Sequence, residues 1–203
     1  MALQAPHLDV AGTADLLDEQ SLVEEARANP DAFARLYRLY LPRVHAFARR
    51  RTGSSEAAED ICSATFEKAL RNLHKFRWRS GGFAPWILRI ASNETTAYYR
   101  QEGRPNSRRG QLAMSRHHES ASEDDLPQVL LGETEQLRVA LDQLPPRYQR
   151  AIALRYLADL EPDEAAQAMG LAKPALAVVL SRALKALRRE IERSTETSEV
   201  ENV

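Results

Sequence analysis

Residues 162–180, PDEAAQAMGLAKPALAVVL, carry the spacing that decides the fold of the C-terminal part of this chain. Counted from Pro162 as position 1, Ala166 lies at position 5 and Gly170 at position 9, with apolar residues at positions 4, 8, 10, 15 and 18. Two short helices that cross steeply need a small residue at the crossing, a glycine in the turn and apolar residues that hold the second helix to the first. The spacing predicts a helix-turn-helix, whose second helix can enter the major groove of DNA, although other helical hairpins also satisfy it.

Apolar residues recur at helical spacing through most of the remaining chain, and no strand-like alternation appears. Asn29 followed by Pro30 is a typical helix start, and Gly53 ends the amphipathic segment that follows. We therefore predict an all-α protein of two small helical domains joined by a flexible linker. The predicted parts are an N-terminal extension (1–28), a first domain (29–100), a linker (101–133), a helix-turn-helix domain (134–193) and a disordered acidic tail (194–203).

Length and composition exclude several classes of protein. The chain has 203 residues, of which 43% are hydrophobic and 28% charged, as expected of folded domains with a sizeable core. No apolar run approaches the roughly 20 residues that cross a bilayer, and the N-terminus lacks the pattern of a secretory signal. We expect no membrane insertion and a cytoplasmic location. The single cysteine, Cys62, excludes an internal disulfide and a zinc site built on thiolates.

The net charge of −1 hides a sorted distribution. Residues 31–111 carry +9 and residues 134–189 carry +3, whereas residues 1–30, 112–133 and 190–203 carry −5, −4 and −4. Two basic blocks separated and flanked by acidic ones suggest two domains that face a polyanion. The alternative is that the basic faces are only solvated.

Aromatic residues are concentrated between Phe76 and Arg100, where six of the 13 aromatics of the chain lie. Arginines are interleaved with them. Because aromatic rings stack on unpaired bases and arginines bind phosphates, this composition suits single-stranded or melting DNA. Phe83 and Trp86 also fit the apolar stripe of a helix, and we expect Phe83 to belong to the core.

The sequence offers little for an enzyme. His117, His118 and Glu119 are adjacent in a polar segment, where a histidine pair is more often solvated than bound to a metal. Cys62 lacks the basic neighbour that would make it a nucleophile. No glycine-rich phosphate loop and no nucleophile elbow is present. We expect no catalytic residues, no metal and no cofactor.

Two blocks of the chain together resemble an extracytoplasmic-function (ECF) sigma factor of the bacterial sigma-70 family. Residues 59–69, EDICSATFEKA, are similar to the family's helix that docks on the clamp helices of the largest RNA polymerase subunit. Residues 83–93, FAPWILRIASN, are similar to the helix that reads the promoter's minus-ten element, and the loop 76–82 matches the position of the loop that holds a flipped base. Residues 144–150 and the helix-turn-helix resemble the domain that reads minus-thirty-five DNA.

The resemblance implies three sets of contact residues. For core polymerase they are Glu59, Asp60, Thr65, Phe66, Glu67 and Arg71. For minus-ten DNA they are Phe76, Arg77, Trp78, Arg79, Trp86, Arg89, Asn93, Tyr98 and Arg100. For minus-thirty-five DNA they are Lys173, Ala177, Arg182, Lys185 and Arg188.

The chain departs from the family pattern at several of the DNA-facing positions. Ala97 and Ser92 stand where the family often has Asp and Arg, and the usual polar residues of the recognition helix are replaced by Ala172, Ala175, Ala177 and Val178. Among its groove-facing positions only Lys173 can donate a hydrogen bond to a base, which predicts weak upstream specificity.

The resulting hypothesis is a sigma factor that directs core RNA polymerase to specific promoters and starts transcription by recognising and melting the minus-ten element. Its partners would be core polymerase, promoter DNA and, as the family implies, an anti-sigma factor. Two alternatives remain open. One is a helix-turn-helix regulator that acts without being a polymerase subunit, and the other is a sigma-like decoy that occupies polymerase without starting transcription.

Overall fold

The structure, a computed structural model, describes residues 13–102 and 136–201, with side chains placed for 18–101 and 136–193. Within these ranges the chain forms helices and turns without a strand, which confirms the prediction of an all-α protein. The predicted linker lies almost entirely outside the described residues. The elements are α1 (Thr13–Glu25), α2 (Pro30–Thr52), α3 (Ser55–Asn72), a 3-10 turn η1 (Leu73–Lys75), α4 (Ala84–Glu102), a helical stretch 136–142, α7 (Pro146–Ile152), a π-helical turn η2 (Ala153–Leu157), α8 (Pro162–Met169) and α9 (Lys173–Glu201).

Local sequence signals fix the ends of α2 and α3. The Asn29 side chain accepts a hydrogen bond from the Asp31 backbone N–H at 3.0 Å, as expected of a helix cap. Gly53 ends α2 in the left-handed conformation, with φ of 72°, which suits a residue without Cβ. Ser54 then caps α3 by accepting from the Ala57 N–H at 3.2 Å. These caps place the break between the two helices where the sequence predicts it.

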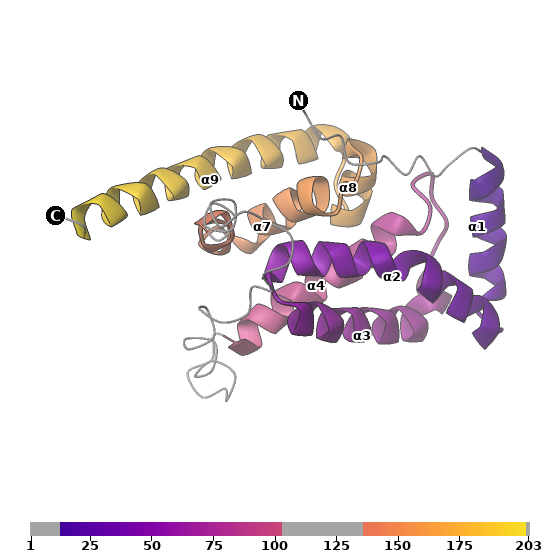
Figure 1. Ribbon diagram of the computed structural model, residues 1–203. Helices are drawn as coiled ribbons and strands as arrows, with labels where there is room; N and C mark the ends of the chain where they lie inside the picture. The colour runs from indigo at the N-terminus through magenta and orange to yellow at the C-terminus, as the bar shows by residue number, and fades with distance from the viewer. Residues whose placement is uncertain (1–12, 103–135, 202–203) are drawn as a thin grey trace, which may run out of the picture.

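The N-terminal half is a bundle in which α2, α3 and α4 pack on one another and α1 packs on α2 (Figure 1). Its core contains Phe47, Phe76 and Phe83. The described part of the N-terminal extension belongs to this bundle, because Val23 and Ala26 are buried in the same core. The sequence alone, lacking a strong apolar stripe before Asn29, places the start of the domain later.

The Glu19 carboxylate of α1 fixes that helix to the bundle. It accepts a hydrogen bond from the Phe83 backbone N–H at 3.1 Å and another from the Tyr40 hydroxyl. Arg27, just beyond α1, donates to the Phe76 carbonyl at 3.0 Å. These bonds connect the residues before α2 to both ends of the loop 76–82.

The helix-turn-helix consists of α8, the turn at Gly170 and the start of α9. Gly170 is left-handed with φ of 67°, and the Leu171 N–H donates to the Ala166 carbonyl at 2.9 Å, which closes the turn. Ala166, Leu176 and Val179 are buried between the two helices, as their spacing predicts. A reciprocal capping box between Glu161 and Glu164 starts α8.

The backbone of α9 continues to Glu201, so the prediction of a disordered tail from residue 194 is wrong for residues 194–201. The sequence after Pro174 contains neither glycine nor proline, and its glutamates are good helix formers. An acidic composition suggested disorder, but it contains no signal that would end a helix.

The two halves pack against each other. In Figure 1, α8 lies over α4, and η2 contacts both α2 and α4. One contiguous core runs from Phe47 and Phe83 in the N-terminal half to Leu154 and Leu160 in the C-terminal half. A second, smaller core holds α9 on α7 and the helical stretch 136–142, through Leu141, Leu144, Ile152, Ala183 and Leu187.

Candidate nucleic-acid interface

The loop 76–82 and the exposed side of α4 form one continuous surface, which we call the minus-ten face. Its exposed members are Arg77, Arg79, Arg89, Asn93 and Arg100. Trp78, Trp86 and Tyr98 are half-buried. Four cations and one amide along one loop and one helix can bind backbone phosphates and a base edge, the chemistry that the sequence predicts for this segment.

Phe76 does not belong to this surface, which corrects one predicted site residue. Its side chain is 2% exposed and its ring lies 5.4 Å from that of Phe83 and 5.3 Å from that of Trp86. Trp78 packs edge-on against Phe76 at 6.1 Å. We call these four rings the aromatic cluster. It supports the loop from beneath, because edge-to-face rings at these separations attract one another.

The loop approaches the C-terminal half closely. A Cβ placed on Gly81 would lie 3.1 Å from the side-chain oxygen of Gln167 and 3.3 Å from Cγ of Glu164, both in α8. Because Gly81 has no side chain, the loop can pack closely against Glu164 and Gln167 of α8. A base held in the loop 76–82 would meet α8 in the packed arrangement of the two halves.

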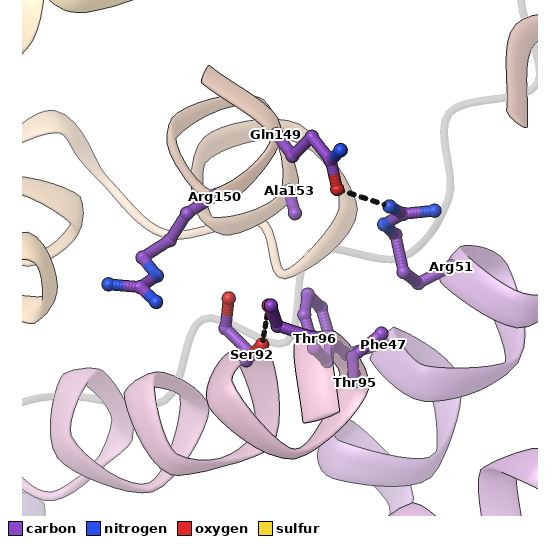
Figure 2. Close-up of a pocket in the computed structure, with 8 residues that line it drawn as sticks. All are labelled: Phe47, Arg51, Ser92, Thr95, Thr96, Gln149, Arg150 and Ala153. Carbon is purple, nitrogen blue, oxygen red and sulfur yellow. Dashed lines mark hydrogen bonds between the residues drawn. The ribbon is translucent and has the colours of Figure 1, made fainter. Parts of the chain in front are cut away.

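Arg51 is the main polar connection between the halves, and the sequence analysis did not single it out. Its side chain, buried at the end of α2, forms an ion pair with Asp142. It also donates to the Gln149 side-chain oxygen at 2.9 Å, as Figure 2 shows. Its guanidinium also lies 4.7 Å from the ring centre of Tyr99. The sequence does contain a signal that Arg51 is buried, because it continues the helical stripe of the buried Val44 and Ala48.

Tyr99 secures Arg51 from the side of α4. Its hydroxyl donates to the Arg51 carbonyl at 2.8 Å, and burial raises its pKa to about 12. Arg50 adds a further bond between the halves, donating to the Leu157 carbonyl at 2.9 Å. The end of α2 is thus bonded to α4 and to the C-terminal half at once.

Arg150 of α7 introduces like-charge repulsion between the two halves, in contrast to the bonds of Arg50 and Arg51. Figure 2 shows it extending from α7 above Ser92 of α4. Burial and then the neighbouring charges of Arg89 and Arg100 lower the pKa of Arg150, and its buried Nε atom has no hydrogen-bond partner among the residues that the structure describes. The cavity between these elements measures about 10 Å³, enough for about one water. The halves therefore meet through favourable bonds at Arg51 and like-charge repulsion at Arg150.

The predicted polymerase contacts on α3 divide into two groups. Glu59, Asp60, Glu67 and Arg71 are exposed, as a docking face requires. Thr65 and Phe66 are 0% and 5% exposed, so the prediction that they contact polymerase is corrected. Both lie on the side of α3 that packs in the bundle, and the Phe66 ring lies 4.6 Å from that of Tyr37.

A groove between α2 and α3 adjoins the exposed acidic face and was not predicted from the sequence. It has a volume of about 540 Å³ and is lined by Tyr37, Leu41, Pro42, His45, Glu59, Cys62 and Ser63. Burial, and secondarily Glu59, raises the pKa of the Cys62 thiol to about 11. The thiol is therefore protonated near neutral pH, which fits the expectation that it is not a nucleophile.

The outward side of α9 carries the predicted upstream DNA contacts. Lys173, Ala177, Arg182, Lys185 and Arg188 are all exposed. Lys173 is not directed only to solvent, because its Nζ donates to the Asp163 carboxylate of α8 at 2.8 Å. The basic residues farther along α9 remain placed for phosphate contacts.

Within the described residues, no group of histidine, cysteine and carboxylate side chains is arranged to hold a metal ion. His117, His118 and Glu119 lie outside that part of the chain. No helix that the structure describes combines the length and apolar character needed to span a membrane.

Comparison with known proteins identifies both halves. Residues 36–105 match the Sigma-70 region 2 family, and residues 134–187 match the Sigma-70 region 4 family. The ECF RNA polymerase sigma factor BldN of Streptomyces coelicolor is 31% identical over 185 residues, covering 90% of this chain and 69% of BldN. SigM of Bacillus subtilis, also an ECF RNA polymerase sigma factor, is 26% identical over 75% of this chain and 91% of its own.

Solved structures share the fold. CnrH, solved with the cytosolic domain of CnrY, aligns with a TM-score of 0.60 at 20% identity, over 86% of this chain and 97% of CnrH. RpoE of Bartonella quintana aligns with a TM-score of 0.52 at 23% identity, over 79% of this chain and 96% of its own. Together with the two region matches and the relatives, the helical halves show that this chain belongs to the sigma-70 family as an ECF RNA polymerase sigma factor.

Proposed function

We propose that this sigma factor recognises and melts the minus-ten element with the minus-ten face, and anchors upstream with the outward side of α9. The observation that carries the proposal is the placement of Arg77, Arg79, Arg89, Asn93 and Arg100 on one exposed surface beside the aromatic cluster. Unstacking a base costs a few kcal/mol, and stacking on a ring together with phosphate contacts offsets that cost. The proposal keeps 134–193 as the second domain and extends the first domain, 29–100, toward the N-terminus to include the buried Val23 and Ala26.

Binding alone accounts for the proposed role. The relatives named above are sigma factors by name and none is named as an enzyme, which supports a function without catalytic residues or cofactor. Since core polymerase acts on chromosomal DNA, we place the factor in the cytoplasm. An anti-sigma factor is a proposed third partner, because RpoE of Bartonella quintana was solved in complex with the anti-sigma factor NepR.

The experiment that tests the function is run-off transcription with purified core polymerase and a library of promoter fragments. A sigma factor yields transcripts that depend on it and on a selected minus-ten sequence. A helix-turn-helix regulator would bind duplex DNA but would not copurify with core polymerase. A decoy would bind core polymerase and yield no transcript, so the two measurements together separate all three functions.

We expect Asp60→Lys to weaken core binding about tenfold, because Asp60 lies on the exposed acidic face of α3 beside the apolar groove. Reversing a charge at an electrostatically complementary interface costs on the order of 1.4 kcal/mol or more. The measurement is the dissociation constant of the sigma–core complex without DNA. Glu192→Lys, a charge reversal on an exposed residue of α9, is the matched control and should bind core polymerase normally. Equal affinities for the two variants would place the docking surface elsewhere.

Asn93→Ala should reduce open-complex formation more than binding to closed duplex DNA. Asn93 is exposed in the middle of α4, and its amide can both donate to and accept from one base edge, a pairing worth about 1–3 kcal/mol. Permanganate reactivity of the minus-ten thymines reports melting, and we expect it to fall about fivefold to 150-fold. Gln101→Ala, which removes an exposed amide at the end of the same helix, is the control. Parental reactivity in Asn93→Ala would remove this residue from the mechanism.

A further inference from the structure

The solvent-facing side of the first turns of α9 is apolar. Ala175, Ala177 and Val178 are exposed there, and Val178 is the largest of them at 50% exposure. Their neighbours Leu176 and Val179 face inward and are buried, so the rotation of the helix is fixed by the core. The exposed valine is therefore held outward by the packing of its neighbours on α8.

The same turns offer a base only one side chain that can donate a hydrogen bond, and that side chain is also engaged in an ion pair. Lys173 has the only polar side chain among the groove-facing positions 172, 173, 174, 177 and 178, and its Nζ donates to Asp163 at 2.8 Å. The carboxylate of Asp163 holds that cation toward α8. Guanine, adenine and cytosine are distinguished in the major groove by hydrogen bonds, for which these positions provide only the remaining N–H groups of Lys173.

Thymine differs from the other bases because it presents a methyl group in the major groove. Apolar side chains discriminate thymine by contact with that methyl group. The exposed cations Arg182, Lys185 and Arg188 on the same helix suit a DNA backbone rather than an apolar protein surface. Charge and apolar character together favour a thymine-containing major groove as the occupant of this surface.

We propose that Val178 is a specificity-determining residue of this sigma factor, and that it selects thymine in the upstream element by contact with the 5-methyl group. The proposal rests on the proposed function, since it requires α9 to lie in the major groove. The neighbouring Ala177 has a short side chain, so it does not keep Val178 away from the floor of the groove. Upstream recognition then depends on shape and on methyl groups, with phosphate contacts supplying affinity for any sequence.

The test replaces thymine with deoxyuracil, which lacks only the methyl group. Upstream sequences are first selected from a random library by the holoenzyme, and each thymine of the selected element is then replaced singly. We expect at least one replacement to lower holoenzyme affinity about fourfold, the effect of removing one buried methyl group. Replacements outside the element should change nothing.

The variant Val178→Ala connects the effect to the residue. With it, thymine and uracil at the sensitive position should bind equally. Lys185→Ala is the matched control, because loss of a phosphate contact should weaken both duplexes alike and preserve their ratio. Together these results would establish methyl readout by Val178.

Other outcomes overturn the proposal in distinguishable ways. If the holoenzyme selects an upstream element yet never discriminates uracil from thymine, methyl readout is excluded and the sigma function stands. If Val178→Ala keeps the parental ratio, Val178 is not the reader and its apolar surface serves another contact, such as a protein partner. If transcripts form but no upstream element is selected, thymine selection by Val178 is excluded and the sigma function stands. If no transcript is obtained at all, the proposed function itself fails.

Discussion

Asp142→Ala should shift the two halves of this sigma factor about tenfold toward a separated arrangement, and raise its affinity for single-stranded minus-ten DNA by up to about tenfold in the absence of polymerase. The substitution leaves Arg51 buried in the packed arrangement without its carboxylate, although Gln149 and Tyr99 still contact it. Leaving a buried charge without its partner costs about 3–5 kcal/mol. Because 35% of the Asp142 side chain is exposed, we expect a smaller effect, about 1.4 kcal/mol or tenfold.

Separation favours DNA binding because the packed arrangement restricts the minus-ten face. Glu164 and Gln167 of α8 lie against the loop at Gly81, and the like charges of Arg89 and Arg100 act on Arg150, whose pKa they lower after burial. DNA phosphates would relieve the repulsion among these arginines, whereas packing of the halves concentrates it. Binding of minus-ten DNA and packing of the halves should therefore compete.

Two measurements check the prediction. Energy transfer between labels on α3 and α9 reports separation, and fluorescence anisotropy of a minus-ten oligonucleotide reports affinity. Glu190→Ala is the control, because it removes a carboxylate whose ion pair with Arg193 lies within α9. If Asp142→Ala changes neither the label distance nor the affinity, the ion pair with Arg51 does not hold the halves together.

The arrangement around Arg51 shows what the sequence cannot reveal. Helix ends follow from short-range signals, so Asn29, Gly53 and Gly170 predict the observed caps and turns directly. The contact between Arg51 and Asp142 joins residues 91 positions apart and depends on how two helical halves rotate onto each other. No local pattern encodes that rotation.

The corrections on α3 and in the loop have a different cause. The resemblance assigns whole segments and not the two sides of a helix, so it includes Thr65, Phe66 and Phe76 among the contact residues. The burial of Thr65 and Phe66 follows from helical spacing, since both lie on the same side of α3 as Cys62 and Ala69. Phe76 lies in the loop and is buried by its contacts with Phe83 and Trp86. Applying the period of the helix to the matched segment would have removed Phe66 from the polymerase contacts.

Phe83→Ala should lower the free energy of unfolding by about 3–5 kcal/mol, the usual cost of removing a buried phenylalanine ring. Its side chain is 1% exposed, and its ring lies 5.1 Å from Tyr40, 5.4 Å from Phe76 and 5.2 Å from Trp86. Deleting the ring leaves a cavity where α2, α4 and the loop 76–82 meet. The bond from the Phe83 N–H to Glu19 remains, so the backbone cannot simply move to fill the space.

The effect should appear in urea unfolding followed by tryptophan fluorescence, because the only two tryptophans, Trp78 and Trp86, both belong to the aromatic cluster. Tyr156→Ala is the control, since that ring is 51% exposed and its loss should change stability by about 0.5 kcal/mol or less.

If Phe83→Ala does not fold, Phe83→Leu keeps much of the side-chain volume and should lower the free energy of unfolding by less than about 1.5 kcal/mol. A Phe83→Leu variant as unstable as a full deletion would mean that ring geometry, not volume, supports the loop. A Phe83→Ala variant as stable as the Tyr156→Ala control would show that the loop 76–82 holds its shape without the ring of Phe83. The aromatic cluster would then not be what supports Trp78 and the loop.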